Sequence, residues 1–167
     1  QVLAVGLQDR AALAVGCVRP VAAETHQPAR LVEPHPEVLD LANPAVQEHL
    51  FKTVSGILEE SGATYVKWDM NRNMSEAGSP TLPPERQGEV MHRYILGLYS
   101  LYGRLIEAFP DVLFEGCAGG GGRFDLGLAR YSPRFWTSDQ SDAVERLEIQ
   151  YGTSLVFPPE LIGSHVS

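Results

Sequence analysis

The chain has 167 residues and a formal net charge of −8 at pH 7, with a sequence pI near 5.0. This length allows one sizeable core, and the acidic balance argues against nucleic acids and anionic membranes as partners. No apolar run reaches the roughly 18 to 20 residues of a membrane-spanning helix, and no signal-peptide pattern is present. Cys17 and Cys117 lack disulfide or zinc-type spacing, so we expect a reduced, cytoplasmic protein without a structural metal.

The opening portion of the chain differs in composition from the rest. Of its 6 Phe, 6 Tyr and 2 Trp, none occurs before Phe51. The first residues are rich in alanine and valine with weak periodicity, and prolines interrupt residues 20–36. We assign no secondary structure to residues 1–32 and treat residues 1–36 as an atypical or unstructured segment.

The first predicted elements are a strand and a helix. Residues 38–41 form a short apolar run typical of a strand. Asn43-Pro44 then supplies a helix N-cap followed by proline at the first helical position. Apolar residues recur at helical spacing as far as Gly62, which is placed to end the helix in the left-handed conformation.

A second predicted strand, residues 65–69, ends in charged side chains. Side chains alternate along a strand, so Lys67 and Asp69 share one face while Val66 and Trp68 share the other. A lysine and an aspartate on an otherwise apolar strand are costly to bury unless they are paired or used in a site. We therefore interpret Asp69 as a catalytic carboxylate.

The middle of the chain continues the alternation of helices and strands. A long polar loop over residues 73–84 is typical of a functional or mobile segment. A helix from about residue 85 to residue 109 ends before Pro110. A strand follows at residues 112–117, and the glycine run of residues 118–122 comes directly after it.

The last third of the chain predicts a strand at residues 131–139, a helix capped by Ser141 or Asp142, and a final strand at residues 154–157. Such alternation requires parallel strands, in a doubly wound sheet or in part of a (β/α)8 barrel. The barrel is favoured, because three consecutive strands carry a carboxylate near the end where barrel sites lie: Asp69, Glu115 and Asp139. A complete barrel takes about 250 residues, so this chain covers part of one.

Asp69 and Asp139 are candidates for a glycosidase pair. Retaining glycosidases need two carboxyl groups about 5 to 5.5 Å apart, and strand ends separated by one strand lie about 9 to 10 Å apart at the backbone. Inward-pointing side chains could span that gap. Lys67 would favour the ionised form of Asp69 and could hold a substrate hydroxyl. The spacing alone leaves capping roles for the aspartates, and a structural ion pair for Lys67, equally open.

Cys117 and the glycines after it are weaker signals. Cys117 is typical of a small buried hydrophobe, since no nearby histidine activates it as a nucleophile. The glycine run lacks the GxxxxGK[ST] pattern of a phosphate-binding loop. Close approach of backbone amides to a hydroxylated ligand and a plain tight turn both fit it.

Four stretches, in a fixed order, carry a specific resemblance to a known family. They are YVKWDMNR at residues 65–72, LPPERQG at 82–88, FEGCAGGGGRFD at 114–125, and WTSDQSDA at 136–143 with ER at 145–146 and IQYGTS at 149–154. Together they resemble the bacterial α-galactosidases of glycoside hydrolase family 36. The resemblance extends over roughly residues 38–167.

The resemblance implies a retaining (β/α)8 hydrolase flanked by two β-domains. Residues 37–167 would form the central part of that TIM barrel, roughly the third to seventh β/α units. The resemblance further implies that Asp69 is the nucleophile and Asp139 the general acid/base, with Asp142 as a helix cap. The residues it assigns to galactose hydroxyls are Lys67, Asn71, Cys117, Gly119 and Gly120.

The resemblance also implies a substrate class. We expect an exo-acting α-galactosidase for terminal galactose in melibiose- and raffinose-type oligosaccharides, without a metal or organic cofactor. The family is often tetrameric, so we expect a homo-oligomer in the full-length enzyme. Because much of the pocket would be missing, we expect the isolated chain to be inactive.

The chain departs from the family pattern before His35-Pro36, where no aromatic residue occurs and Glu33 or a neighbour stands in place of an expected arginine.

Two alternatives to an α-galactosidase remain. In an enolase-like barrel, Asp69, Glu115 and Asp139 would bind Mg²⁺ while Lys67 abstracts a proton. A non-catalytic barrel remnant would expose edge strands and an apolar face, and would tend to aggregate.

Overall fold

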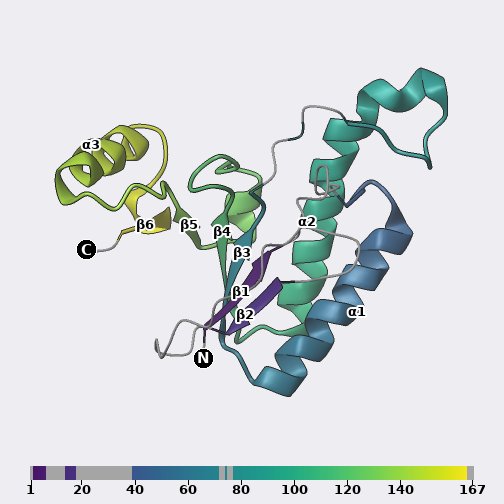
Figure 1. Ribbon diagram of the computed structural model, residues 1–167, viewed down its shortest axis with the longest axis horizontal. Helices are drawn as coiled ribbons and strands as arrows, with labels where there is room; N and C mark the ends of the chain where they lie inside the picture. Colours follow the sequence, from purple (N-terminus) through teal and green to yellow (C-terminus); the bar gives the residue numbers. More distant parts are fainter. Residues whose placement is uncertain (1, 7–13, 18–38, 72–73, 75–76, 165–167) are drawn as a thin grey trace, which may run out of the picture.

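The computed structural model describes residues 2–6, 14–17, 39–71, 74 and 77–164, with the backbone alone for the first two ranges. Six strands form one sheet in the order β2-β1-β3-β4-β5-β6 (Figure 1). The strands are β1 (Val2–Gly6), β2 (Ala14–Cys17), β3 (Tyr65–Asp69), β4 (Leu113–Cys117), β5 (Arg134–Trp136) and β6 (Ile162–Gly163).

The sheet is parallel from β1 to β6, and β2 adds an antiparallel edge strand beside β1. The helices between the parallel strands are the crossovers that such strands require. This confirms the predicted parallel α/β class. The order β3-β4-β5 also confirms that one strand separates the two strands before the candidate carboxylates.

Two strands form in the portion of the chain to which the sequence analysis assigns no secondary structure. β1 pairs with β3 in register from Val2 opposite Tyr65 to Gly6 opposite Asp69. The partner strand is more than fifty residues away along the chain, so local periodicity could not indicate the pairing. Most of residues 1–36 lie outside the described residues, and their separation as an atypical segment stays a prediction.

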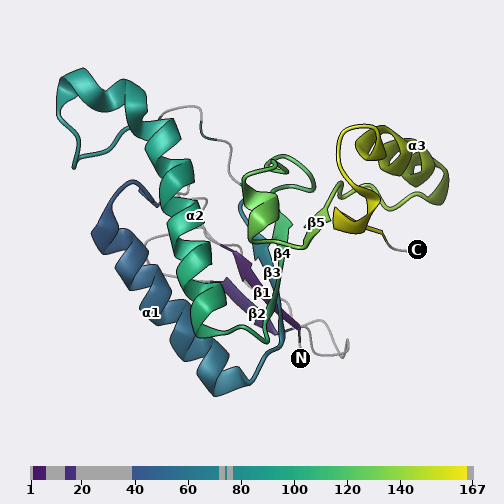
Figure 2. The same cartoon turned by 180° about the vertical axis from the view of Figure 1, so that it is seen from behind.

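Helices α1 (Pro44–Ser61) and α2 (Val90–Ala108) lie side by side on one face of the sheet (Figures 1 and 2). The ends of α1 agree with the sequence prediction. Asn43 is the N-cap, and its side-chain oxygen accepts a hydrogen bond from the amide of Ala45 at 2.9 Å. Gly62 ends the helix with φ at 62°, in the left-handed region that glycine enters without steric cost.

The strand predicted for residues 38–41 is wrong over the described residues 39–41. Residues 39 and 40 have no regular secondary structure, and a turn begins at Leu41. The carboxylate of Asp40 accepts hydrogen bonds from the Ala42 amide at 3.0 Å and from the Ser79 hydroxyl. An aspartate that bonds to the backbone two residues on favours a turn over a strand.

The core lies between the sheet and the two helices. Val66 and Trp68 on β3 have no exposed surface, and the Trp68 and Tyr102 rings have centroids 5.1 Å apart. Lys67 and Asp69 lie on the other face and are half-buried, as the alternation predicted. Burying a large apolar side chain contributes about 1.5 to 3 kcal/mol, so this alternation commits β3 to one orientation.

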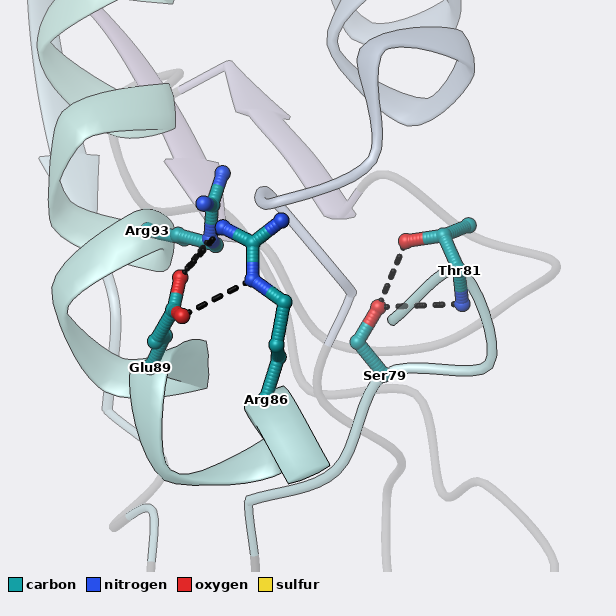
Figure 3. A network of polar contacts seen from close by, with 5 residues as sticks. All are labelled: Ser79, Thr81, Arg86, Glu89 and Arg93. Carbon is teal, nitrogen blue, oxygen red and sulfur yellow. Dashed lines mark hydrogen bonds and ion pairs between the residues drawn. The ribbon is translucent and has the colours of Figure 1, made fainter. Parts of the chain in front are cut away.

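The described part of the loop before α2 is held by hydrogen bonds. Gln87 donates hydrogen bonds to the carbonyls of Ser79 and Leu82. Figure 3 shows the hydrogen bond between the hydroxyl groups of Ser79 and Thr81. A 3₁₀ helix, Pro84–Glu89, then leads into α2, although the sequence predicts one continuous helix from residue 85. Figure 3 shows Glu89 at this junction, paired with Arg86 and Arg93 at 2.7 Å each.

The C-terminal third contains α3 (Ala143–Ser154), which lies beside β6 and away from α1 and α2 in both views (Figures 1 and 2). The strand predicted at residues 154–157 is wrong. The amide of Phe157 bonds to the carbonyl of Thr153, and its ring stacks on Phe124 with centroids 3.9 Å apart. None of the helices in the described ranges has the length and apolar character of a membrane crossing.

Candidate active site

Asp69 is the last residue of β3 and the register partner of Cys117, the last residue of β4. Both lie at the carboxyl end of a parallel strand, and alternation along β3 puts Asp69 on the face opposite to Trp68, which packs against Tyr102 of α2. The Oδ1 atom of Asp69 is buried and has no hydrogen-bond partner among the described residues. A buried carboxylate oxygen without a donor carries a desolvation cost, which is acceptable where a ligand supplies the missing contact.

Cys117 is a buried free thiol beside this carboxylate. Burial raises the pKa of Cys117 to about 11, and the negative charge of Asp69 adds to the increase. The thiol is therefore protonated at neutral pH, where it can act as a weak hydrogen-bond donor but not as a nucleophile. This agrees with the sequence analysis, which did not favour a nucleophilic role.

The ammonium group of Lys67 lies 4.6 Å from the centroid of the Trp136 ring, at the end of β5. No ion pair joins Lys67 to Asp69 among the described residues. The lysine therefore reaches across β4 toward the next strand, on the same side of the sheet as Asp69. A cation over an indole ring is an attractive contact, and it holds the lysine close to the strand ends.

The glycines after β4 form a tight turn, and the side chain of Asn71, which follows β3, is hydrogen-bonded to it. Gly119 and Gly120 have φ values of 56° and 81°, in the left-handed region. The side-chain oxygen of Asn71 accepts a hydrogen bond from the Gly119 amide at 2.6 Å. The structure thus brings the loop after β3 and the loop after β4 into direct contact.

The same turn packs closely against the segment after β5. A Cβ atom on Gly120 would lie 2.6 Å from the Cα atom of Ser138 and 3.0 Å from the amide nitrogen of Asp139. One on Gly121 would lie 2.6 Å from the carbonyl oxygen of Thr137. The glycines are needed here for close packing of backbone on backbone, and they fix the place of the segment that carries Asp139.

Asp139 lies three residues beyond the end of β5, in an exposed loop, so its predicted place at the end of a strand is wrong. The strand ends early because β6 pairs with β5 only at Phe135 and Trp136. The indole N–H of Trp136 donates a hydrogen bond to the Asp139 carboxylate at 3.0 Å. Asp142 caps α3 by accepting hydrogen bonds from two helix amides, as predicted.

Glu115 does not join the two aspartates. It is buried in β4, where it pairs with Arg134 at 3.2 Å and accepts a hydrogen bond from the hydroxyl of Tyr65. In the described ranges, no group of three or more His, Cys, Asp or Glu residues has a metal-binding arrangement. The enolase-like alternative needs Glu115 beside Asp69 and Asp139, and the structure does not favour it.

Sequence reasoning missed three residues of this region: Arg134, Trp136 as a contact residue, and Arg146. Arg146 on α3 is only 3% exposed and donates hydrogen bonds to the segment that carries Asp139. The helical pattern of α3 gave no signal for it, because arginine usually occupies an exposed helix face. Trp136 and Arg146 do occur in the stretches that carry the family resemblance.

A sequence model of the family described as Melibiase matches residues 22–167 of the chain. The chain belongs to the melibiase family. Among curated relatives, alpha-galactosidase 1 of Pediococcus pentosaceus is 56% identical over 130 residues, which are 78% of this chain and 18% of the relative. Alpha-galactosidase AgaA of Geobacillus stearothermophilus is 55% identical over the same length. This melibiase chain thus spans about a fifth of the length of these relatives.

Solved structures agree with this assignment. The crystal structure of the GH36 alpha-galactosidase AgaA from Geobacillus stearothermophilus matches with a TM-score of 0.76 and 51% identity, over 84% of this chain and 20% of that chain. AgaB from the same organism matches with a TM-score of 0.77 and 52% identity, over the same shares. The melibiase chain therefore shares its fold with one part of these enzymes.

Proposed function

We propose that residues 37–167 form the central part of the (β/α)8 barrel of a retaining exo-α-galactosidase, roughly its third to seventh β/α units. The observation that supports this most is the arrangement of strand ends. Asp69 and Asp139 lie on either side of the Cys117 strand end, and the glycine turn contacts the segments that carry them. The similarity to alpha-galactosidases over about four fifths of this chain supports the same conclusion.

In this proposal, Asp69 attacks the anomeric carbon of an α-linked galactose while Asp139 donates a proton to the departing glycosidic oxygen. A covalent galactosyl ester forms on Asp69, and the aglycone leaves. Asp139, now ionised, then takes a proton from a water molecule that attacks the same carbon, which releases α-galactose and restores both carboxyl groups. No step needs an oxidant or reductant.

The choice of these two aspartates gains support from two structures of AgaA. In the raffinose complex an aspartate is replaced by asparagine, and in the stachyose complex a different aspartate is replaced by alanine. Those two positions are separated in that enzyme by the same number of residues as Asp69 and Asp139 here. Replacing a catalytic carboxylate is a standard way to preserve an intact substrate in a crystal.

The remaining residues assigned from the resemblance would bind the sugar. Lys67 and Asn71 offer nitrogen donors for galactose hydroxyls, and the protonated thiol of Cys117 offers a weak donor. Gly119 and Gly120 allow a hydroxylated ring to approach backbone amides closely. Substrates of the melibiose and raffinose type, a cytoplasmic location and a homotetramer in the full-length enzyme belong to the same proposal.

The proposal can be tested by completing the barrel. Residues 39–167 would replace the homologous segment of Geobacillus stearothermophilus AgaA, and this spliced enzyme should release galactose from raffinose. In it, Asp69→Ala and Asp139→Asn should each lower kcat/KM for raffinose by about 10² to 10⁴-fold. Asp111→Asn, a change of an exposed aspartate before β4, is the matched control and should leave kcat/KM unchanged.

Two results would overturn the proposal. One is a folded spliced enzyme without any turnover. The other concerns azide rescue: Asp69→Gly with sodium azide should form β-galactosyl azide, and an α-azide product would show that Asp69 is not the nucleophile.

The isolated 167-residue chain should not hydrolyse an aryl α-galactoside, because it would lack the rest of the pocket. Clear turnover by that chain would make the other barrel units dispensable.

A further inference from the structure

Helix α3 turns an arginine, and not its apolar residues, toward the rest of the molecule. Arg146 is 3% exposed, whereas Val144, Leu147 and Tyr151 are each about 70% exposed. Arginine is almost never this deeply buried without a specific use. The unusual orientation of the helix therefore directs attention to what the guanidinium group contacts.

The guanidinium group of Arg146 bonds to both sides of the segment that carries the candidate acid/base. Its Nη1 donates to the carbonyl of Ser138 at 3.0 Å and to that of Gln140 at 3.5 Å. Its Nη2 donates to the Thr137 hydroxyl at 3.2 Å and to the Gly163 carbonyl at 3.1 Å. One side chain therefore connects the segment after β5 to the β6 strand end.

Arg146 also contacts the residue that holds the Asp139 carboxylate. Its guanidinium carbon lies 5.5 Å from the centroid of the Trp136 ring, and the Trp136 N–H donates to Asp139 at 3.0 Å. Among the described residues, Arg146 has no carboxylate partner, and its Nε has no hydrogen-bond partner. A buried cation without a counterion is costly to stability, so helix packing alone does not account for it.

We propose that Arg146 is a positioning residue for the general acid/base Asp139; this inference rests on the proposed function. Its planar group fixes the backbone on both sides of Asp139 and the indole ring that donates to the carboxylate. The carboxyl group is thereby kept at one place relative to the glycosidic oxygen. Lysine cannot replace this arrangement, because a single ammonium group lacks the rigid fork of donors.

The proposal predicts a specific kinetic signature. A sugar leaving group needs a proton from the acid as the glycosidic bond breaks, whereas nitrophenolate leaves readily without one. A misplaced acid should therefore slow the hydrolysis of raffinose much more than that of p-nitrophenyl α-galactoside. A general loss of folded enzyme would lower both activities by the same factor.

The experiment uses Arg146→Lys in the spliced enzyme defined above. We expect kcat/KM for raffinose to fall about 30 to 100-fold, because misplacement of a catalytic group by about 1 Å can cost 10²-fold, and that for p-nitrophenyl α-galactoside to fall less than about threefold. Trp136→Phe keeps a ring but deletes the N–H donor, and should change the ratio of the two activities in the same direction. If Arg146→Lys does not fold, the activity ratio of Trp136→Phe still tests whether these contacts position the Asp139 carboxyl group.

Arg104→Lys is the matched control. Like Arg146, Arg104 lies over an aromatic ring, that of Phe51, but it belongs to the helical layer, where it pairs with Glu48. It should not change the activity ratio. An unchanged ratio in the Arg146 and Trp136 variants would overturn the positioning role. That outcome differs from failure of the proposed function, in which the unsubstituted spliced enzyme would act on neither substrate.

Discussion

The ammonium group of Lys67 and the indole ring of Trp136 are in contact across β4, with the nitrogen 4.6 Å from the ring centroid. Such a contact contributes about 0.5 to 2 kcal/mol, depending on how far it is desolvated. The same indole donates to Asp139, and Lys67 lies two residues before Asp69. Trp136 thus connects the surroundings of both candidate carboxylates.

Replacing Gly120 should disrupt the site locally. In Gly120→Ala, the added Cβ would meet Ser138 at 2.6 Å, and the φ value of 81° is unfavourable for alanine. We expect the free energy of unfolding to fall by about 1 to 3 kcal/mol, measured by urea denaturation of the spliced enzyme, together with a loss of kcat.

Gly56→Ala is the control for that change. Gly56 lies inside α1, and a Cβ atom there would meet nothing within 4 Å. Alanine is the better helix former by about 0.5 to 1 kcal/mol, so this variant should be stabilised. If both glycine variants changed stability in the same direction, the close packing of Gly120 on the Asp139 segment would be wrong.

Substitution of Asp142 should affect mainly stability, whereas substitution of Asp139 should affect mainly activity. Asp142→Ala removes the N-cap of α3 and should cost about 1 kcal/mol of stability, with a small effect on turnover. Asp139→Asn should leave the thermal midpoint nearly unchanged and lower kcat/KM for raffinose by about 10² to 10⁴-fold. Differential scanning calorimetry with a raffinose assay on both variants checks this. The reverse pattern would make Asp142 the acid/base.

Glu115→Gln distinguishes a structural carboxylate from a metal ligand. The amide can still accept the Tyr65 hydrogen bond but loses its charge attraction to Arg134. Since the arginine side chain is 43% exposed, we expect a modest loss of about 1 kcal/mol. Galactosidase activity should persist and should resist EDTA. Loss of activity that added Mg²⁺ restores would instead favour the enolase-like alternative.

The thiol of Cys117 should lose its proton at an unusually high pH. Because its pKa is raised from 9.0 to about 11 in the folded chain, the folded state keeps the proton that the unfolded state loses above pH 9. The stabilising contribution is complete below pH 9 and is lost as the pH rises to about 11. Thiolate absorbance at 240 nm in a Cys17→Ser background measures this. An apparent pKa near 9 in folded protein would contradict burial of the thiol.

Much of the fold could be predicted from local patterns. Asn43 and Gly62 mark the ends of α1 because capping depends on residues within one turn. The alternation along β3 predicted which side chains enter the core, since only one face of the strand meets the helices. The predicted order of elements was sufficient for a parallel α/β sheet, because short crossovers leave few other topologies.

The candidate site could be predicted only in part. Asp69 was proposed as a candidate because a charged residue at the end of an apolar strand is unusual, and the structure places it at the last position of β3, as predicted. The predicted strand end at Asp139 was wrong, because the extent of β5 depends on pairing with β6, which lies in a distant segment. Glu115 also looked like a site residue, until its contacts with Arg134 and Tyr65 gave it a structural role.

The sequence by itself determined the ends of α1 and the parallel class, and it proposed Asp69 as a candidate site residue, because each of these depends on neighbours along the chain. Tertiary structure decided the pairing of β1 with β3 and the close packing of the glycine turn on the segment that carries Asp139. It also decided the burial of Arg146 against that segment. Each of these joins segments that are distant in sequence or reverses the usual exposure of a residue. Only packing can select such contacts, since no local preference encodes them.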